Sequence, residues 1–241
     1  MIKLETHCHV RGGSSCAHVK ARTLVKEYAK GGYGAVTLTT HYCKNCYDSY
    51  PGDTHKQKID YFLSLRNHLK DKARKYGLKV FTGAEVLAVT PANTYAEFML
   101  GGFDDKLLYD TKPFFTFTQK ELFEFADNNK IFMYQTHPFR KGVMTGDPHY
   151  MHGAEAFNGH ANHNNCNAFA ENFCDRYSLV KLSGTDYHDA HQPLTAGVFV
   201  PENIENERQL ADFYFDGKVD RIMDKVGYEK EYALRHYGRK K

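Results

Sequence analysis

The sequence predicts an α/β barrel with its functional site at the carboxyl ends of the strands. Short apolar or β-branched runs alternate with segments of helical periodicity along most of the chain, an order typical of parallel strands joined by helices. Histidine, glutamate and aspartate residues repeatedly follow the apolar runs and do not precede them. Barrels of this class carry their sites on the residues that follow the strands.

Length and composition predict a single globular domain over residues 1–241, with a basic tail over about 218–241. The chain has 241 residues, 41% hydrophobic and 25% charged, which is enough to bury one sizeable core. Its net charge of +3 is too small to favour nucleic acid as a partner, although nucleic acid stays possible. No oligomeric state is predicted.

The sequence also predicts a cytoplasmic protein without membrane contact. No apolar run approaches the roughly 20 residues that a spanning helix needs. Met1 leads directly into the first apolar run, which does not resemble a signal peptide. The six cysteines are therefore expected to be reduced.

The first strand, over residues 2–10, carries His7 and His9. Residues two apart on a strand face the same side, so both imidazoles are expected to point to one place. A loop with Gly12 and Gly13 follows, and then a helix with apolar residues from Ala21 to Ala29, which ends at two glycines.

The next elements place two further candidate ligands. A strand over 35–39 leads to His41, a helix over about 56–76 follows, and a strand over 78–81 has Glu85 just beyond it. Between them, Cys43 and Cys46 form a single pair with two residues between its members. Without a second pair, ordinary loop cysteines are favoured over a zinc or redox site.

The second half of the chain delivers the remaining candidates. Residues 86–113 show no clear pattern, and Thr118 with Glu121 then predicts a capping box that opens a helix. The other expected strands lie over 131–135, 154–157, 179–183 and 197–200, and the other expected helices lie over about 164–177 and 205–215. The candidate side chains that follow these strands are His137, Arg140, His160, His163, Asp186 and His188.

Five apolar runs thus end in His, Glu or Asp, which predicts a cluster of nitrogen and oxygen ligands. The motifs are His7-x-His9, Thr40-His41, Gly83-Ala-Glu85, Thr136-His137-Pro and Gly184-Thr-Asp186-Tyr-His188. In this order the set resembles the PHP (polymerase and histidinol phosphatase) family, and the match runs from residue 1 to about 200. The resemblance implies a distorted (β/α)7 TIM-like barrel that holds two or three divalent ions, zinc, manganese or iron, and hydrolyses phosphate esters.

The resemblance also implies a role for each matching residue. His7, His9, Glu85 and Asp186 correspond to the ligands of one metal, Glu85 bridges to a second that His137 also binds, and His41 and His188 correspond to ligands of a third.

Two departures from the family pattern favour two ions over three. Family members usually have Asp or His shortly after the first motif, where Ser14 or Ser15 stands here. His18 or Cys16 is the candidate that could take the place of this missing family ligand. A further histidine after the bridging glutamate is absent, and Asp104 is the nearest replacement.

Beyond the ligands, Arg140 is the candidate for gripping a phosphate, because its planar fork matches phosphate oxygens. Arg11 is a weaker candidate, and His160 and His163 are expected near substrate or metal. No role is expected for the remaining histidines, which are His55, His68, His149, His152, His191 and His236.

We therefore expect a phosphoesterase that acts on a small phosphorylated metabolite or nucleotide through metal-activated water, with Glu85, Asp186 and Arg140 as catalytic residues. Three alternatives stay open. An amidohydrolase-type barrel would usually need a metal-bridging lysine at a strand end, and no lysine occupies one. The others are a metal-dependent nuclease and a regulatory module that binds metal without turnover.

Overall fold

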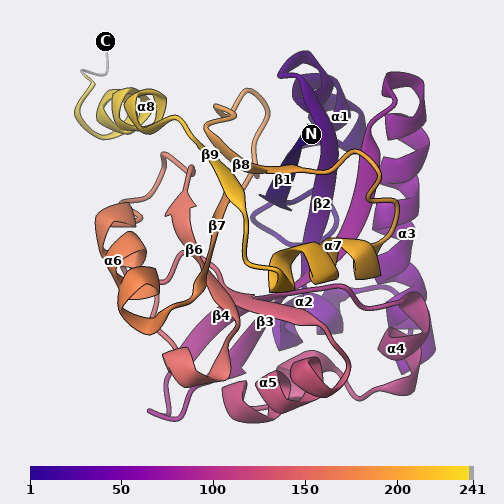
Figure 1. Cartoon of the computed structure of the whole chain (residues 1–241). Helices are drawn as coiled ribbons and strands as arrows, with labels where there is room; N and C mark the ends of the chain where they lie inside the picture. The colour runs from indigo at the N-terminus through magenta and orange to yellow at the C-terminus, as the bar shows by residue number, and fades with distance from the viewer. Residues whose placement is uncertain (239–241) are drawn as a thin grey trace.

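The computed structural model describes residues 1–238 and shows a single sheet rolled into a nearly closed barrel with helices around it (Figure 1). The strands are β1 (Ile2–Cys8), β2 (Tyr33–His41), β3 (Lys79–Val89), β4 (Tyr95–Gly101), β5 (Phe132–Gln135), β6 (Gly153–Asn158), β7 (Val180–Gly184), β8 (Ala196–Val200) and β9 (Asp220–Met223). The helices are α1 (Ala21–Lys30), α2 (Lys44–Ser49), α3 (His55–Ala73), α4 (Asp105–Asp110), α5 (Gln119–Asn128), α6 (Asn167–Tyr177), α7 (Glu207–Phe215) and α8 (Lys225–Tyr237). The α/β barrel predicted from the sequence is confirmed.

The barrel closes where the end of β1 meets the segment that follows β7. The sheet order is β7-β6-β5-β4-β3-β2-β1-β8-β9. Cys8 forms a parallel bridge with Tyr187, and the backbone N–H of His9 donates to the Tyr187 carbonyl at 2.9 Å. The Thr6 hydroxyl donates to the Ser183 carbonyl at 2.9 Å. This closure brings the first and last of the predicted motifs side by side.

The expectation of parallel strands is wrong at β8, and β4 and β9 are antiparallel strands that the sequence did not predict. Strand β3 continues past Glu85 to Val89 and pairs with antiparallel β4, which lies in the stretch that showed no pattern. The connection over residues 90–94 is too short for the crossover that parallel strands require. Strand β8 pairs antiparallel with β1, and β9 pairs antiparallel with β8.

The expected basic tail is ordered as far as the structure describes it. It contains β9 and α8, and α8 rests on the loop that follows β6. The Tyr228 hydroxyl donates to the His163 carbonyl at 2.9 Å, and Arg235 donates to the Asn162 side chain at 2.6 Å. Residues 239–241 of the predicted tail lie outside the described residues. No helix within 1–238 combines the length and apolar character needed to cross a membrane.

Helix starts follow local sequence signals. The predicted capping box of Thr118 and Glu121 is confirmed at the start of α5. A second capping box, from Thr54 and Gln57, opens α3. Both satisfy backbone N–H groups that have no partner within their own helix.

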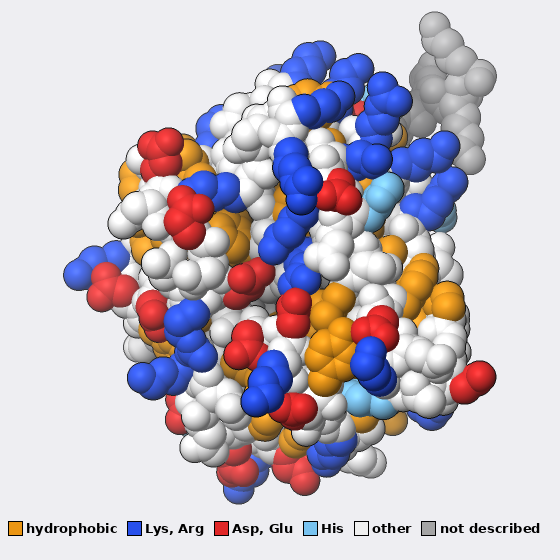
Figure 2. All heavy atoms as spheres, turned by 90° about the vertical axis from the view of Figure 1, so that its right-hand side faces the viewer, with side chains coloured by type: hydrophobic (Ala, Val, Ile, Leu, Met, Phe, Trp, Pro, Cys, Tyr) orange, Lys and Arg blue, Asp and Glu red, His pale blue; other side chains and the backbone are white. Residues whose placement is uncertain are grey.

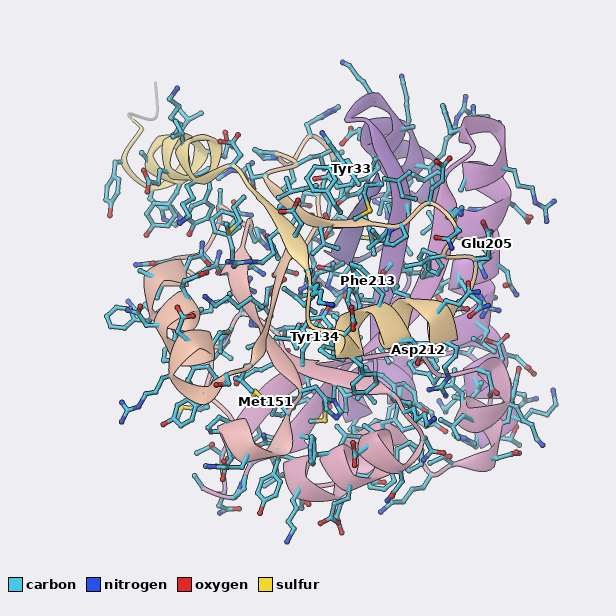
Figure 3. The ribbon with its side chains drawn as sticks, in the orientation of Figure 1. Tyr33, Tyr134, Met151, Glu205, Asp212 and Phe213 are labelled. Carbon is cyan, nitrogen blue, oxygen red and sulfur yellow. The ribbon has the colours of Figure 1, made fainter. Side chains whose placement is uncertain are left out.

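Helix α7 covers the amino-terminal end of the barrel, opposite the predicted site. Its Leu210, Ala211 and Tyr214 pack with barrel residues from the early parts of the strands, such as Leu4 and Phe81. Figure 3 shows Tyr134 and Phe213 at the place where α7 crosses this end. One mouth of the barrel is therefore filled with apolar side chains, and the other end is left for polar groups.

Truncating a core side chain on α3 should lower stability sharply. Ile59 is 0% exposed within the cluster that joins α3 to the sheet. Ile59→Ala should reduce the free energy of unfolding by about 2–5 kcal/mol in chemical denaturation, because it removes buried methyl groups and leaves a cavity. Val226→Ala is the control, because Val226 is 60% exposed; equal effects of the two changes would contradict this packing.

Candidate metal centre

The strand ends carry the predicted ligands to one rim of the barrel. His41 and Glu85 are paired residues of neighbouring strands β2 and β3. His137 follows β5 and Asp186 follows β7, and both have positive φ angles, of 31° and 50°. Such backbone is uncommon for residues with a side chain, and it concentrates at functional sites.

Four of the predicted ligands converge at the first position. His7 Nε2 lies 3.4 Å from Glu85 Oε1 and 3.3 Å from Asp186 Oδ1. His9 Nε2 lies 3.4 Å from Glu85 Oε2 and 3.3 Å from Asp186 Oδ1. The structure thus brings together His7, His9, Glu85 and Asp186 as the sequence predicted.

A second position lies on the other side of Glu85 and includes a residue that the sequence did not indicate. His137 Nε2 is 3.3 Å from Glu85 Oε1 and 3.6 Å from Glu97 Oε2. Glu97 belongs to β4, within the stretch that showed no pattern. Asp104, the expected replacement ligand, instead caps α4 by accepting a hydrogen bond from the Leu107 N–H at 2.9 Å. The prediction for Asp104 is therefore wrong.

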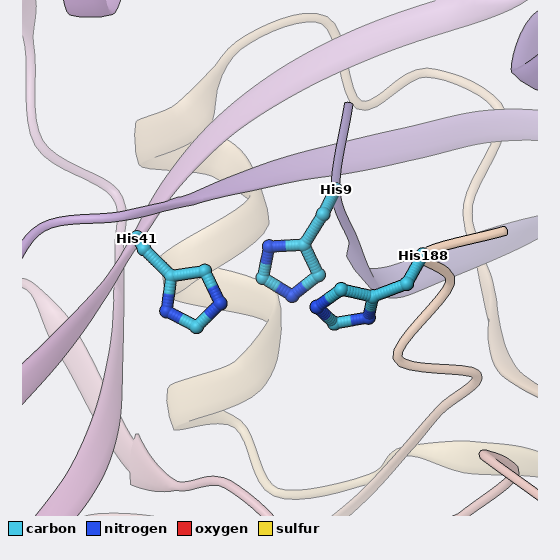
Figure 4. Close-up of side chains that lie close together, drawn as sticks. All are labelled: His9, His41 and His188. Carbon is cyan, nitrogen blue, oxygen red and sulfur yellow. The ribbon is translucent and has the colours of Figure 1, made fainter. Parts of the chain in front are cut away.

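A third position is formed by His9, His41 and His188, whose ligand nitrogens lie within 4.8 Å of one another. Figure 4 shows their rings facing one another from three different segments. His41 Nδ1 is also 3.3 Å from Glu85 Oε2, so this group adjoins the first position. His160, Asp186 and His188 form a further group that shares His188.

The donor set is suited to divalent ions. Buried polar atoms in proteins nearly always have a hydrogen-bond partner. His7 Nε2, His9 Nε2 and Glu85 Oε2 have none, although all three are buried and face the same point. Imidazole nitrogens with carboxylate oxygens are typical ligands of zinc, manganese and iron. The residues at this rim therefore fit the metal centre that the sequence predicted.

The charges in the cluster depend on one another. Burial opposes the ionisation of Glu85, but the positive charges of His7 and His41 outweigh burial and hold its pKa well below the usual range. At Asp186, His7 and Arg140 outweigh burial in the same way, and the pKa of this carboxyl is also well below its usual range. Burial also opposes protonation of His7, yet Asp186 and Glu85 raise its pKa well above the usual value. Without a cation, His7 thus carries the proton that balances the carboxylates.

Two buried carboxyl groups that the sequence reasoning missed hold the first motif in place. Glu155 Oε1 lies 3.1 Å from His7 Nδ1, and Glu155 Oε2 accepts from the His137 N–H at 2.9 Å. Glu5 accepts from the His7 N–H at 2.8 Å and from the Thr185 N–H at 2.9 Å. Each acid stands inside an apolar strand run, a signal that could have identified it. Contact at Nδ1 directs His7 Nε2 toward the cluster.

Arg140 reaches the cluster, as predicted. Its guanidinium pairs with Asp186 and donates to Asn165 at 2.8 Å and to Asn158 at 3.0 Å. Within residues 1–238, these bonds use Nε and Nη2 and leave Nη1 without a protein acceptor. Arg140 lines a cleft of about 270 Å³ together with Glu85, Glu97 and His137. A guanidinium held in this way offers donors to an anion in the cleft.

The structure places some of the weaker candidate residues at the cluster or the cleft and others on the surface. His160 is buried, with Nδ1 3.4 Å from Asp186 Oδ2. His163 is exposed at the cleft and stands in none of the ligand groups found among the described residues. His18 Nδ1 pairs with Asp189 at 2.9 Å, and Arg11 is exposed outside the cleft. His163 thus lies at the cleft, and His18 is paired on the surface.

The remaining cysteines and histidines lie away from the cleft lining. Cys43 and Cys46 are free cysteines at α2. The histidines for which no role was expected, His55, His68, His149, His152, His191 and His236, do not line the cleft.

The chain shares its fold with solved structures of low sequence identity. PsfC from Pseudomonas syringae superposes with a TM-score of 0.68 at 12% identity, over 97% of this chain and 96% of that protein. A two-domain protein from Bacteroides vulgatus that contains a predicted PHP-like metal-dependent phosphoesterase gives 0.61 at 16%, over 97% and 69%. A lesion-specific endonuclease from Pyrococcus furiosus gives 0.55 at 12%, over 91% and 57%.

Neither a family model nor a curated protein sequence matches the chain. The fold and the rim cluster define a TIM-like barrel with a candidate metal centre at the carboxyl ends of its strands. This fold is shared with the protein that contains a predicted PHP-like metal-dependent phosphoesterase, which confirms the resemblance predicted from the sequence at the level of the fold.

Metal binding should weaken as the pH falls. In the absence of a cation, neighbouring carboxylates and Cys16 outweigh burial and raise the pKa of His41 to about 9 and that of His188 to about 10. Each must release a proton to bind an ion. Affinity for zinc or manganese should therefore drop by up to about tenfold per pH unit for each proton released, and activity should fall with it. Calorimetry in buffers of different ionisation enthalpy checks this; affinity that is independent of pH would contradict it.

Removing Glu97 should weaken one ion selectively. Glu97→Ala should reduce the affinity of one bound ion by more than about tenfold, because it removes a carboxylate from the position formed with Glu85 and His137. Glu124→Ala, at an exposed position of α5, is the control. Metal titration followed by elemental analysis measures the loss, and an unchanged metal content in Glu97→Ala would exclude Glu97 as a ligand.

Proposed function

We propose that this protein is a metal-dependent phosphoesterase that hydrolyses a small phosphorylated metabolite or nucleotide. Two or three divalent ions, zinc, manganese or iron, would be held by the three positions around Glu85. When bound there, such ions would supply a water of lowered pKa and neutralise phosphate oxygens.

One observation carries the proposal above the others. Glu85 lies within 3.4 Å of four imidazole nitrogens from three different segments, namely those of His7 and His9, of His41 and of His137. A single carboxylate shared in this way places neighbouring cation positions side by side, the arrangement that phosphoryl transfer uses to stabilise attacking and leaving oxygens.

The chain's own residues supply the remaining needs of phosphate chemistry. Arg140 presents a fixed guanidinium at the cleft, and His163 stands at its mouth. Partial burial at the cleft and the nearby Arg140 lower the pKa of His163 to about 4, so His163 is neutral at physiological pH and donates or accepts a hydrogen bond without adding charge.

The size of the cleft favours a small substrate. Its volume of about 270 Å³ is slightly below the range of about 300–1,000 Å³ for small-molecule sites. The upper part of the face in Figure 2 gathers Lys and Arg, and its lower part mixes them with Asp and Glu. A nuclease would use a continuous basic track to follow the backbone of nucleic acid, and the lower part of this face, where the two charges alternate, does not supply one.

The amidohydrolase alternative has less support from the site. A metal-bridging lysine would have to line the cleft, and the residues that line it among those described include no lysine. A regulatory module without turnover would need neither a fixed Arg140 nor an accessible cleft. The nuclease keeps second place because the barrel also superposes on an endonuclease.

Substrate assays with defined metal content test the proposal. The protein loaded with zinc, manganese or iron is assayed on a panel of phosphomonoesters, phosphodiesters and short DNA. We expect hydrolysis of a phosphomonoester or nucleotide and joint loss of metal and turnover in Glu85→Ala. Cleavage of DNA alone would favour the nuclease, and bound metal with no turnover on any substrate would favour the regulatory module.

Replacing Arg140 should impair turnover more than metal binding. Arg140→Lys keeps a positive charge beside Asp186 but loses the fork that contacts Asn165 and Asn158. We expect kcat/KM for the phosphorylated substrate to fall by about 10²–10³, with metal content retained. Arg11→Ala is the control, because Arg11 is exposed outside the cleft. If Arg140→Lys and the unchanged protein had equal kcat/KM, the result would show that the guanidinium of Arg140 is not needed to bind the substrate.

A further inference from the structure

A thiol lies beside the third group of imidazoles. Cys16 Sγ is 3.5 Å from His41 Nε2. Cys16 lines the same cleft as His41 and His188. The position is reached by the loop between β1 and α1, in which the sequence has serines where a family ligand was expected.

A second observation at the same place points to a ligand. His9 is 1% exposed, and neither of its ring nitrogens has a hydrogen-bond partner. Its ring packs against those of His41 and His188, with centroids 4.6 Å and 4.2 Å away, and Figure 4 shows the three rings turned toward one another. A buried imidazole without a hydrogen-bond partner is costly unless a cation accepts the lone pair of its unprotonated nitrogen.

The other two imidazoles direct a nitrogen into this group. His188 Nδ1 contacts the Asp186 carbonyl at 2.9 Å, which makes Nδ1 the protonated nitrogen and leaves the Nε2 lone pair free. His41 Nδ1 faces Glu85 Oε2 at 3.3 Å, so its Nε2 is the nitrogen that faces Cys16. Contacts at Nδ1 of this kind are how proteins orient histidine ligands.

Backbone contacts hold the loop that carries Cys16. On one side, the Tyr50 hydroxyl contacts the Gly13 carbonyl at 3.1 Å. On the other side, the N–H groups of His18 and Val19 both donate to the His188 carbonyl, at 3.0 Å and 2.9 Å. The thiol is therefore fixed next to His41 and His188 although its residue is exposed.

We propose that Cys16 is a thiolate ligand of a divalent ion that His41 and His188 also hold. His9 is close enough to complete a tetrahedral set, or to leave the fourth position to water when it binds the ion at Glu85. When the ion binds, the protons held among Cys16, His41 and His188 are released to solvent. A set of one thiolate and imidazoles selects zinc, cobalt or iron over magnesium and calcium.

This proposal rests on the proposed function in one respect: the ion held by Cys16 lies in the same cleft as the ions held around Glu85. Cobalt reports it directly, because a cobalt–thiolate bond gives charge-transfer absorption in the near ultraviolet that nitrogen and oxygen ligands do not give. The protein loaded with cobalt should show this band, and Cys16→Ser should abolish it and lose a single ion per chain. X-ray absorption of the zinc-loaded protein should show a zinc–sulfur distance of about 2.3 Å.

Cys43→Ser is the matched control, because Cys43 lies outside the cleft lining although it follows His41 closely in the sequence. It should keep both the band and the metal content. Absence of the band from the cobalt-loaded protein, or its persistence in Cys16→Ser, would overturn the thiolate ligand while leaving phosphoester hydrolysis intact. A protein that shows the band but hydrolyses no phosphate ester would instead overturn the proposed function and keep the thiolate ligand.

Discussion

The central constraint in this structure is the balance of charge among buried ionisable side chains. Glu85 and Asp186 are each 1% exposed, and an isolated carboxylate in such a place would cost several kcal/mol. Imidazoles and the Arg140 guanidinium surround them and offset this cost. Because no single partner suffices, the strand ends that carry these groups must stay together for the barrel to be stable.

The closure of the barrel provides that arrangement. Backbone contacts between the end of β1 and Tyr187 join the first motif to the last, and the positive φ of Asp186 turns its side chain toward the His7 ring. The opposite mouth is filled by α7. One end of the barrel therefore provides apolar burial, and the other end is free to concentrate polar ligands.

Prediction from the sequence worked where a signal was local. The histidine pair two residues apart, the capping box at Thr118 and the acids and histidines after apolar runs depend on neighbours in the chain, so their placement could be expected. Glu97 could not, because it belongs to a strand whose pairing with β3 is set by a short connection inside an unpatterned stretch. Asp104 was chosen by sequence distance alone, and its side chain caps a helix instead.

The sequence by itself determined most of the order of strands and helices, the rim at which the reactive residues gather and most of the side chains in the cluster, because periodicity and strand-end position are properties of nearby residues. Only the tertiary structure decided which carboxylates orient which imidazoles, that Glu97 joins His137, and that Cys16 faces His41. These contacts join segments far apart in the chain, and the distances between them are fixed only when the sheet closes on itself.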